Sequence, residues 1–145
     1  MVFDFVILAG GRGKRLKPIT ETYPKAMVRV LGKPLLEWMI EGILSSFGSD
    51  AGKIILVVGF EKEKVMSHFK HKPYAKKLRF AVQEKQLGTA HALQQAKKHV
   101  SAHNFFVLNG DAFFDPSVYD ALAKTGDAPF VVAKRLEDAS QFGVI

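Results

Sequence analysis

Short apolar runs alternate along the chain with stretches in which apolar residues recur every three or four positions. The runs are rich in β-branched and aromatic residues, a composition typical of strands that are buried on both faces of a sheet. Five of these runs predict strands, over residues 5–9, 54–58, 78–82, 105–108 and 130–133. The pattern therefore predicts a sheet whose strands are joined by amphipathic helices.

The stretches between the runs carry the helical periodicity. The longest follows Pro34, which suits a first helical position, and it ends at Gly48. Thr89 and Asp115 are typical N-cap residues, and Pro116 directly follows the second of them. Shorter apolar stripes cover residues 65–69, 93–100 and 118–122.

The alternation of strand and helix, at about 25 residues per unit, defines the expected fold class. It predicts an α/β fold with a Rossmann-like, mainly parallel sheet and helices on both faces, forming one domain over residues 1–145. Residues 142–145 resemble the first residues of another strand. We therefore expect the domain to be truncated at the C-terminus and to be the N-terminal part of a longer one.

The composition excludes several classes of site. With no cysteine, the chain can form no disulfide, zinc–thiolate site or thiol nucleophile. The longest apolar run has five residues, too few for a membrane helix, and Asp4 is unusually early for a signal peptide. We expect a soluble, cytoplasmic protein with no membrane partner.

The net charge of +7 is unevenly distributed. Basic side chains outnumber acidic ones by five to one in residues 12–25 and by seven to two in residues 61–79. Concentrated positive charge attracts phosphate-bearing partners. A nucleotide, a sugar phosphate and a nucleic acid all satisfy this criterion, so charge alone does not choose among them.

Glycine and polar residues follow three of the predicted strands. Residues 10–13 follow the first strand, Gln83 follows the third, and residues 109–111 follow the fourth. Ligands of open parallel sheets bind beyond the carboxyl ends of the strands. We therefore expect these three segments to meet at one edge of the sheet.

The segment after the first strand combines glycines with cations. Three glycines lie within residues 10–13, and four cations lie within residues 12–17. Glycines permit a positive φ and amides that point at an anion, while cations neutralise phosphate charge. The segment is not a dinucleotide fingerprint, because Leu16 stands in place of its last glycine. Nor is it a P-loop, because Arg15 follows Lys14.

Together with their surroundings, these residues resemble the signature of the sugar-1-phosphate nucleotidyltransferases. The resemblance covers essentially the whole chain but only the N-terminal half or so of the usual catalytic domain, and the spacing of its first three segments argues against a chance match. The similar segments are residues 8–20, 24–25, 32–37, 83–90, 109–111 and 142–144.

The resemblance implies an enzyme that uses Mg²⁺, in which a sugar 1-phosphate attacks the α-phosphorus of a nucleoside triphosphate and pyrophosphate leaves. It implies that Arg15 stabilises the charge developing on pyrophosphate and that Lys25 holds the phosphates in line. It also implies that Asp111 binds Mg²⁺ and that Gly143 lies in a loop contacting the sugar. The nucleotide would contact Leu8, Ala9, Gly10, Gly11, Arg12, Gly13, Gln83, Gly88 and Thr89.

Two further expectations follow from the resemblance. Arg15 and Asp111 should face each other across one triphosphate cradle. UTP or dTTP is favoured as the nucleotide, because residues 83–89 are most similar to the uridylyl- and thymidylyltransferase versions of that segment. None of the five histidines is assigned a role.

Several alternatives stay open. The chain could be a non-catalytic regulatory relative that binds a nucleotide or nucleotide sugar, or a cytidylyltransferase for a phospho-alcohol on the same fold. RNA binding is not expected, because no recognition motif accompanies the basic residues. The sugar, the turnover of residues 1–145 alone and a homo-oligomeric state of the full-length protein are left undecided.

Overall fold

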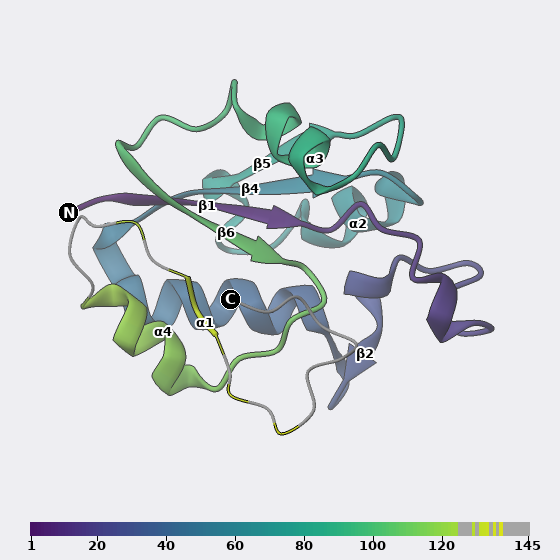
Figure 1. Cartoon of the computed structure of the whole chain (residues 1–145), viewed down its shortest axis with the longest axis horizontal. Coiled ribbons are helices and arrows are strands. Elements are labelled where there is room, and N and C mark those ends of the chain that lie inside the picture. Colours follow the sequence, from purple (N-terminus) through teal and green to yellow (C-terminus); the bar gives the residue numbers. More distant parts are fainter. Residues whose placement is uncertain (125–128, 130, 134, 136, 138–145) are drawn as a thin grey trace.

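A four-stranded sheet, parallel throughout, forms the centre of the structure (Figure 1). The computed structural model describes residues 1–124, 129, 131–133, 135 and 137. The strands occur in the order β5-β4-β1-β6 across the sheet. They are β1 (Phe3–Leu8), β4 (Ala51–Val58), β5 (Leu78–Val82) and β6 (Asn104–Asn109).

The first four strands predicted from the apolar runs are confirmed. β1 begins two residues and β4 three residues before the predicted start, β6 is one residue longer at each end, and β1 ends one residue early at Leu8. The fifth predicted strand covered residues 130–133. Residue 130 lies outside the described residues, and positions 131–133 are not in a strand. Val131 and Val132 are exposed, so the apolar run at these positions is not buried in the described structure.

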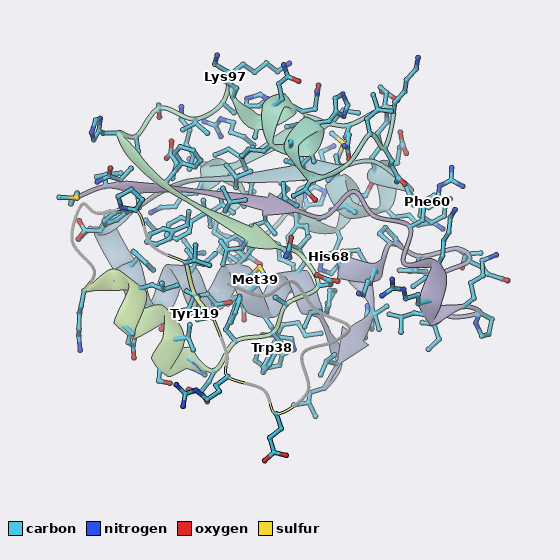
Figure 2. All side chains as sticks on the ribbon, in the orientation of Figure 1. Trp38, Met39, Phe60, His68, Lys97 and Tyr119 are labelled. Carbon is cyan, nitrogen blue, oxygen red and sulfur yellow. The ribbon has the colours of Figure 1, made fainter. Side chains whose placement is uncertain are left out.

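Helices cover both faces of the sheet, as the alternation of elements predicted (Figure 1). Helix α3 packs on one face, against Val6, Ile55 and Val57. Helices α1 and α4 lie against the other face, where Tyr119 of α4 points toward α1 (Figure 2). Within the described residues the helices are α1 (Leu35–Phe47), α2 (Lys62–Phe69), α3 (Thr89–Ala96) and α4 (Pro116–Ala123).

Four short elements lie in the long segment between β1 and α1. Two of them pair as a small antiparallel hairpin, β2 with β3. These elements and the remaining 3₁₀ turns are η1 (Lys14–Leu16), η2 (Lys25–Met27), β2 (Arg29–Val30), β3 (Lys33–Pro34), η3 (Gly48–Asp50) and η4 (Ala75–Lys77).

One of the three predicted helix starts is confirmed. The Asp115 carboxylate accepts a hydrogen bond of 2.9 Å from the backbone N–H of Ser117. The other two predictions are wrong by one residue. Pro34 pairs with Arg29 in the hairpin and is extended, so α1 begins after it, and Gly88 takes the N-cap position before Thr89.

The strand order determines where a ligand can bind. The chain moves outward from β1 through β4 to β5 and then returns to the other side of β1 to form β6. The connections leave β1 in opposite directions, and in such sheets a crevice opens at that point, beyond the carboxyl ends of the strands. None of the helices in the described part of the chain is long and apolar enough to span a lipid bilayer.

Candidate functional site

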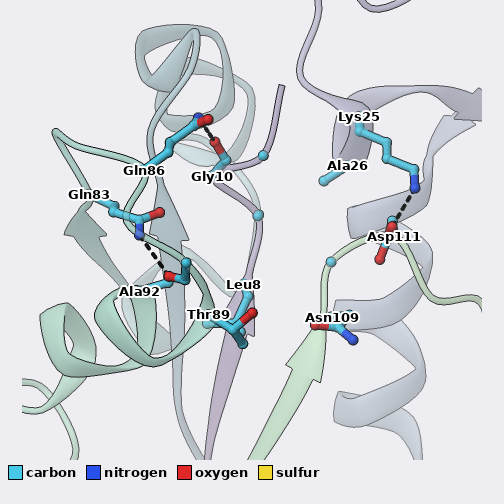
Figure 3. A pocket seen from close by; sticks show the side chains of 14 residues that line it. Leu8, Gly10, Lys25, Ala26, Gln83, Gln86, Thr89, Ala92, Asn109 and Asp111 are labelled. Carbon is cyan, nitrogen blue, oxygen red and sulfur yellow. Dashed lines mark hydrogen bonds and ion pairs between the residues drawn. The ribbon is translucent and has the colours of Figure 1, made fainter. Parts of the chain in front are cut away.

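A cleft of about 340 Å³ lies beyond the carboxyl ends of β1, β5 and β6 (Figure 3). Its walls include most of the residues that the sequence selected: residues 8–11, Lys25, Gln83, residues 88–89 and Asp111. The volume is within the range of small-molecule sites in proteins, roughly 300–1,000 Å³. Segments that are far apart in the sequence therefore meet at one edge of the sheet, as expected.

Asp111 and Lys25 form an ion pair at one side of the cleft (Figure 3). Lys25 Nζ donates to Asp111 Oδ2, and both side chains are about two-fifths exposed. Gly110 holds the end of β6 against β1, because its N–H donates to the carbonyl of Leu8 at 3.0 Å. A Cβ at Gly110 would lie 2.9 Å from that carbonyl oxygen, so only glycine permits this approach. Asn109 also lines this side.

Two glutamines form the opposite side of the cleft. Gln83 is only 5% exposed, and its Nε2 donates to the carbonyl of Gly88 at 3.2 Å and lies 3.0 Å from His91 Nδ1. Gln86 Nε2 donates to the carbonyl of Gly10 at 2.6 Å (Figure 3). The amide nitrogens of both side chains are thus engaged by the protein.

Gly13 gives the loop after β1 its shape. Its φ is +62°, and Thr20 Oγ1 donates to its carbonyl at 2.6 Å. A Cβ at this position would lie 2.8 Å from Lys25 Cβ, so the loop packs directly against the base of the Lys25 side chain. Of the three glycines in residues 10–13, only Gly13 has a positive φ.

Arg12 lies outside the cleft. Its guanidinium is 5.2 Å from the centroid of the Phe60 ring, an arrangement in which a cation is attracted to the ring face. Together with Lys14, Arg12 lines a second hollow of about 390 Å³. This hollow shares Gln83 and Gln86 with the cleft, so the two spaces are neighbours.

Arg15 is also outside the cleft. It lies in η1, the dark purple helical turn at the right of Figure 1, farther out than the carboxyl end of β1. The residue is exposed and has no hydrogen-bond or ion-pair partner among the described residues. The expectation that Arg15 faces Asp111 is not met here, because the chain turns outward after Gly13. Gly143 lies outside the described residues.

The cleft offers one carboxylate for a metal ion. In residues 1–124 and the other described positions, no three His, Asp or Glu side chains gather into a ready-made metal site. Mg²⁺ commonly binds through one or two carboxylates and takes its other ligands from phosphates and water. Asp111, beside a glycine loop and a lysine, is consistent with that kind of site.

Three polar residues at or behind the cleft were not assigned a role from sequence: Gln86, His91 and Asn109. Gln86 and Asn109 lie inside segments that the resemblance singled out, so their position was a usable signal. His91 lies in the first turn of a helix, where no pattern distinguishes it from a surface histidine.

Comparison with known proteins shows which family the chain belongs to. The family model described as nucleotidyl transferase matches residues 5–145. The chain belongs to this family. Within the nucleotidyl transferase family, the bifunctional protein GlmU of Methanococcus maripaludis is 44% identical over 142 residues, which are 98% of this chain and 32% of the relative.

Other members of the nucleotidyl transferase family differ in the substrates that they are named for. The UTP–glucose-1-phosphate uridylyltransferase AglF of Haloferax volcanii is 34% identical over 96% of this chain and 58% of its own length. The solved structure of the CTP:phosphocholine cytidylyltransferase LicC of Streptococcus pneumoniae is 32% identical, with a TM-score of 0.62 over 77% of this chain and 46% of that one. This chain spans about a third of the length of its GlmU relatives.

Proposed function

We propose that the protein transfers a nucleotidyl group from a nucleoside triphosphate to a sugar 1-phosphate, and that residues 1–145 hold the nucleotide. The observation that carries this proposal is the meeting of Lys25 and Asp111 with residues 8–11 and Gln83 around one cleft. A cation, a carboxylate, a glycine loop and a buried amide are the groups that a metal-bound nucleotide requires. The family and the named relatives support the proposal.

The glutamine side of the cleft suits a nucleobase. The Oε1 atom of Gln83 lies over Gly10, where it can accept a hydrogen bond from a base edge. The backbone N–H of Gly88, before the first turn of α3, is a donor at the same rim. An acceptor beside a donor matches the N3–H and O4 groups of uracil or thymine, so we propose UTP or dTTP as the nucleotide.

The opposite side suits the phosphates. Lys25 would leave Asp111 and pair with phosphate oxygens, and the backbone of Gly10 and Gly11 would approach the phosphates without steric hindrance. Asp111, once released, would hold Mg²⁺, which supplies positive charge to the phosphates when it is bound. In this arrangement the cation and the carboxylate that now neutralise each other would both face the triphosphate.

The chemistry needs positioning and charge neutralisation more than covalent catalysis. A phosphate oxygen of the sugar 1-phosphate forms a bond to the α-phosphorus, and the bond from the α-phosphorus to the bridging oxygen of the leaving pyrophosphate breaks. Lys25 would keep the attacking and leaving oxygens in line. Arg15 would stabilise the leaving pyrophosphate if the η1 segment turns toward the cleft. Gly143 is proposed to contact the sugar, and a cytoplasmic location is proposed from the sequence.

A second candidate is favoured by the similarity to LicC. A cytidylyltransferase would use the same cleft and the same chemistry, with a phospho-alcohol in place of the sugar 1-phosphate. The two candidates differ in the nucleobase, which the glutamine side of the cleft contacts, and in the acceptor.

The test is pyrophosphate release by the whole protein with Mg²⁺, measured for each nucleoside triphosphate against a panel of sugar 1-phosphates and phosphocholine. Release with UTP or dTTP and a sugar 1-phosphate supports the proposal, and release with CTP and phosphocholine supports the second candidate. Calorimetric binding of nucleotide without release across the whole panel would instead indicate a regulatory relative.

The same assay tests the assigned residues. We expect Arg15→Ala and Asp111→Ala each to lower turnover at least about 100-fold, because Asp111→Ala removes the carboxylate proposed to hold Mg²⁺ and Arg15→Ala removes the charge that would stabilise the leaving pyrophosphate once η1 turns toward the cleft. Arg29→Ala and Asp120→Ala are matched controls on exposed residues elsewhere in the fold, and they should change turnover less than about twofold. Near-normal turnover of both Arg15→Ala and Asp111→Ala would remove the site assignment.

A further inference from the structure

We propose that His91 is a positioning residue that fixes the side-chain amide of Gln83, so that its oxygen faces the nucleobase and the site prefers uracil to cytosine. The inference rests on the proposed function and adds to it a residue outside the cleft wall. His91 lies in the first turns of α3, behind Gln83, and its ring contacts the buried end of that side chain.

The backbone of Gln83 leaves its side chain little freedom. The N–H of Gln83 donates to the carbonyl of Val58 at 2.8 Å, which continues the β4–β5 pairing by one residue. The side chain is 5% exposed, so solvent cannot satisfy an amide group that lacks a partner inside the protein. Which end of the amide faces the cleft is therefore decided by the groups behind it.

Two acceptors lie behind the amide nitrogen. Gly88 O is 3.2 Å from Gln83 Nε2 and His91 Nδ1 is 3.0 Å from it, so both N–H groups of the amide have a partner. The oxygen points the other way, toward Gly10, where a Cβ would lie 3.3 Å from it (Figure 3). The cleft thus receives the acceptor end of Gln83.

The tautomer of His91 follows from the neighbours of its ring. A neutral imidazole has one N–H and one acceptor nitrogen, yet Gln83 Nε2 and Gln95 Nε2 lie within 3.2 Å of its two nitrogens. Rotating the Gln83 amide would bring its oxygen against the carbonyl of Gly88. Gln95 Nε2 also donates to the backbone carbonyl of His91 at 3.3 Å, but Gln95 is partly exposed, so water can replace that contact when its amide rotates. The tautomer that satisfies the buried Gln83 amide therefore has its proton on Nε2 and accepts from Gln83 at Nδ1.

The orientation of Gln83 has a consequence for base selection. Uracil has an N–H at position 3, which can donate to Gln83 Oε1, whereas cytosine has a lone pair at that position. A buried site built to pair with a donor discriminates strongly against an analogue that lacks it. Without the acceptor at His91 Nδ1, one amide N–H of Gln83 loses its partner. The orientation in which the amide is rotated by 180° then becomes similar in free energy to the native one.

The test compares UTP and CTP binding to His91→Leu, His91→Asn and the unmodified protein by calorimetry, with Mg²⁺ present. Leucine removes the ring acceptor, whereas asparagine places Oδ1 on Cγ, where the histidine has Nδ1. We expect His91→Leu to weaken UTP binding about tenfold and to lower the UTP-over-CTP preference at least about fivefold. His91→Asn should restore most of the affinity for UTP and most of the preference for UTP over CTP.

His71→Leu is the matched control, the same substitution at an exposed histidine, and it should leave both affinities unchanged. If the unmodified protein binds UTP and His91→Leu keeps its full preference, the inference on His91 is overturned and the proposed function stands. If His91→Leu loses UTP and CTP equally and His91→Asn does not rescue, His91 is only structural and the inference is again overturned. If the unmodified protein binds neither nucleotide, both proposals fail.

Discussion

At the scale of single residues, Asp4 shows how one buried carboxylate holds three segments of the chain together. It is 1% exposed and accepts backbone hydrogen bonds from Lys53 at 2.7 Å, Ser101 at 2.7 Å and Ala102 at 2.9 Å. Burial raises the pKa of Asp4, but these N–H groups outweigh it and hold the pKa below its ordinary value of 3.8. The charged form is therefore favoured by folding.

Replacing Asp4 should lower the free energy of unfolding and change how that free energy depends on pH. We expect Asp4→Ala to lower the free energy of unfolding at pH 7 by about 3 kcal/mol, because it leaves buried N–H groups without acceptors. Since the folded pKa is lowered, the contribution is present above about pH 4 and is lost as the pH falls through the lowered pKa.

Urea unfolding of wild type and Asp4→Ala at several pH values measures this. The difference in free energy of unfolding between the two proteins should decrease below about pH 4. Asp50→Ala is a control, since Asp50 is exposed and pairs only with the N-terminal amine at 3.3 Å. An equal loss of stability in the two variants would contradict the role assigned to Asp4.

Whether a residue's place in the candidate site could be predicted from the sequence depends on how that residue is held in the fold. Gln83 and Asp111 line the cleft, because each lies within two residues of the end of a strand and its place is set by the sheet. Arg12 and Arg15 do not line it, because they lie in a loop whose path depends on the positive φ of Gly13 and on packing against Lys25. His91 could not be assigned, since its partner is set by packing between α3 and the sheet.

At the scale of elements, the contact between α1 and α4 is close enough to test by adding one methyl group. Gly42 faces the ring of Tyr119, and a Cβ at Gly42 would lie 2.7 Å from Tyr119 Cε2. Alanine has a higher helix propensity than glycine, by about 1 kcal/mol, but overpacking costs about 1–3 kcal/mol. The cost of overpacking should therefore exceed the gain in helix propensity.

We therefore expect Gly42→Ala to lower the free energy of unfolding by about 1 kcal/mol. In a Tyr119→Leu background the ring is absent, and the same change should stabilise the protein or leave it unaffected. Denaturant unfolding of the four proteins in this cycle provides the measurement. A stabilising effect of Gly42→Ala in the wild-type background would show that α4 does not pack on α1 in this way.

Helix α1 is also joined to α2 and the turn after it. Glu37 is 5% exposed, its Oε2 lies 2.6 Å from His68 Nε2, and its Oε1 accepts from Lys72 Nζ. Burial raises the pKa of Glu37, but Lys72 and His68 outweigh it and hold the pKa below 4.5. The network therefore stabilises the fold above about pH 4.5, and its contribution is lost as the pH falls through the lowered pKa.

Two substitutions in the same helix should separate an ion pair with a buried carboxylate from one with a partly exposed carboxylate. Glu37→Ala removes the shared hydrogen-bond partner of the half-buried Lys72 and His68 side chains, and we expect it to lower the free energy of unfolding by about 2 kcal/mol. Glu41→Ala breaks a pair with Lys33 whose side chains are 30% and 38% exposed, and it should cost less than about 1 kcal/mol. Similar losses, measured by urea unfolding at pH 7, would contradict this account.

The elements themselves were largely predictable. The periodic stretch before Gly48 formed α1 (Leu35–Phe47), and the apolar run over residues 54–58 formed the C-terminal part of β4 (Ala51–Val58). The boundary errors at Pro34 and Thr89 have a local cause. The β2–β3 hairpin keeps Pro34 extended, and Gly88 adopts a φ of +98° that supplies the turn before α3 without a side-chain cap.

At the scale of the whole molecule, the strand order β5-β4-β1-β6 explains why the cleft is where it is. Spacing along the sequence predicted a parallel sheet but not which strands are neighbours, since that order depends on long-range packing. Because β6 lies beside β1, the backbone N–H of Gly110 donates to the carbonyl of Leu8, and Asp111 lies next to the glycine loop. The central claim is that this edge of the sheet holds a nucleoside triphosphate.

The most direct measurement of that claim is the amide NMR spectrum of the protein during titration with UTP and Mg²⁺. We predict that the largest shifts occur at residues 8–11, at Gln83 and Gly88, and at Asp111, which lie on three separate segments around the cleft. Residues of α4, which pack on α1 behind the sheet, should shift little. A further hollow lies between β6 and α4 and is lined by apolar residues that include Phe106, Leu108 and Val118. Shifts centred on this hollow, or a spectrum that UTP leaves unchanged, would contradict the account.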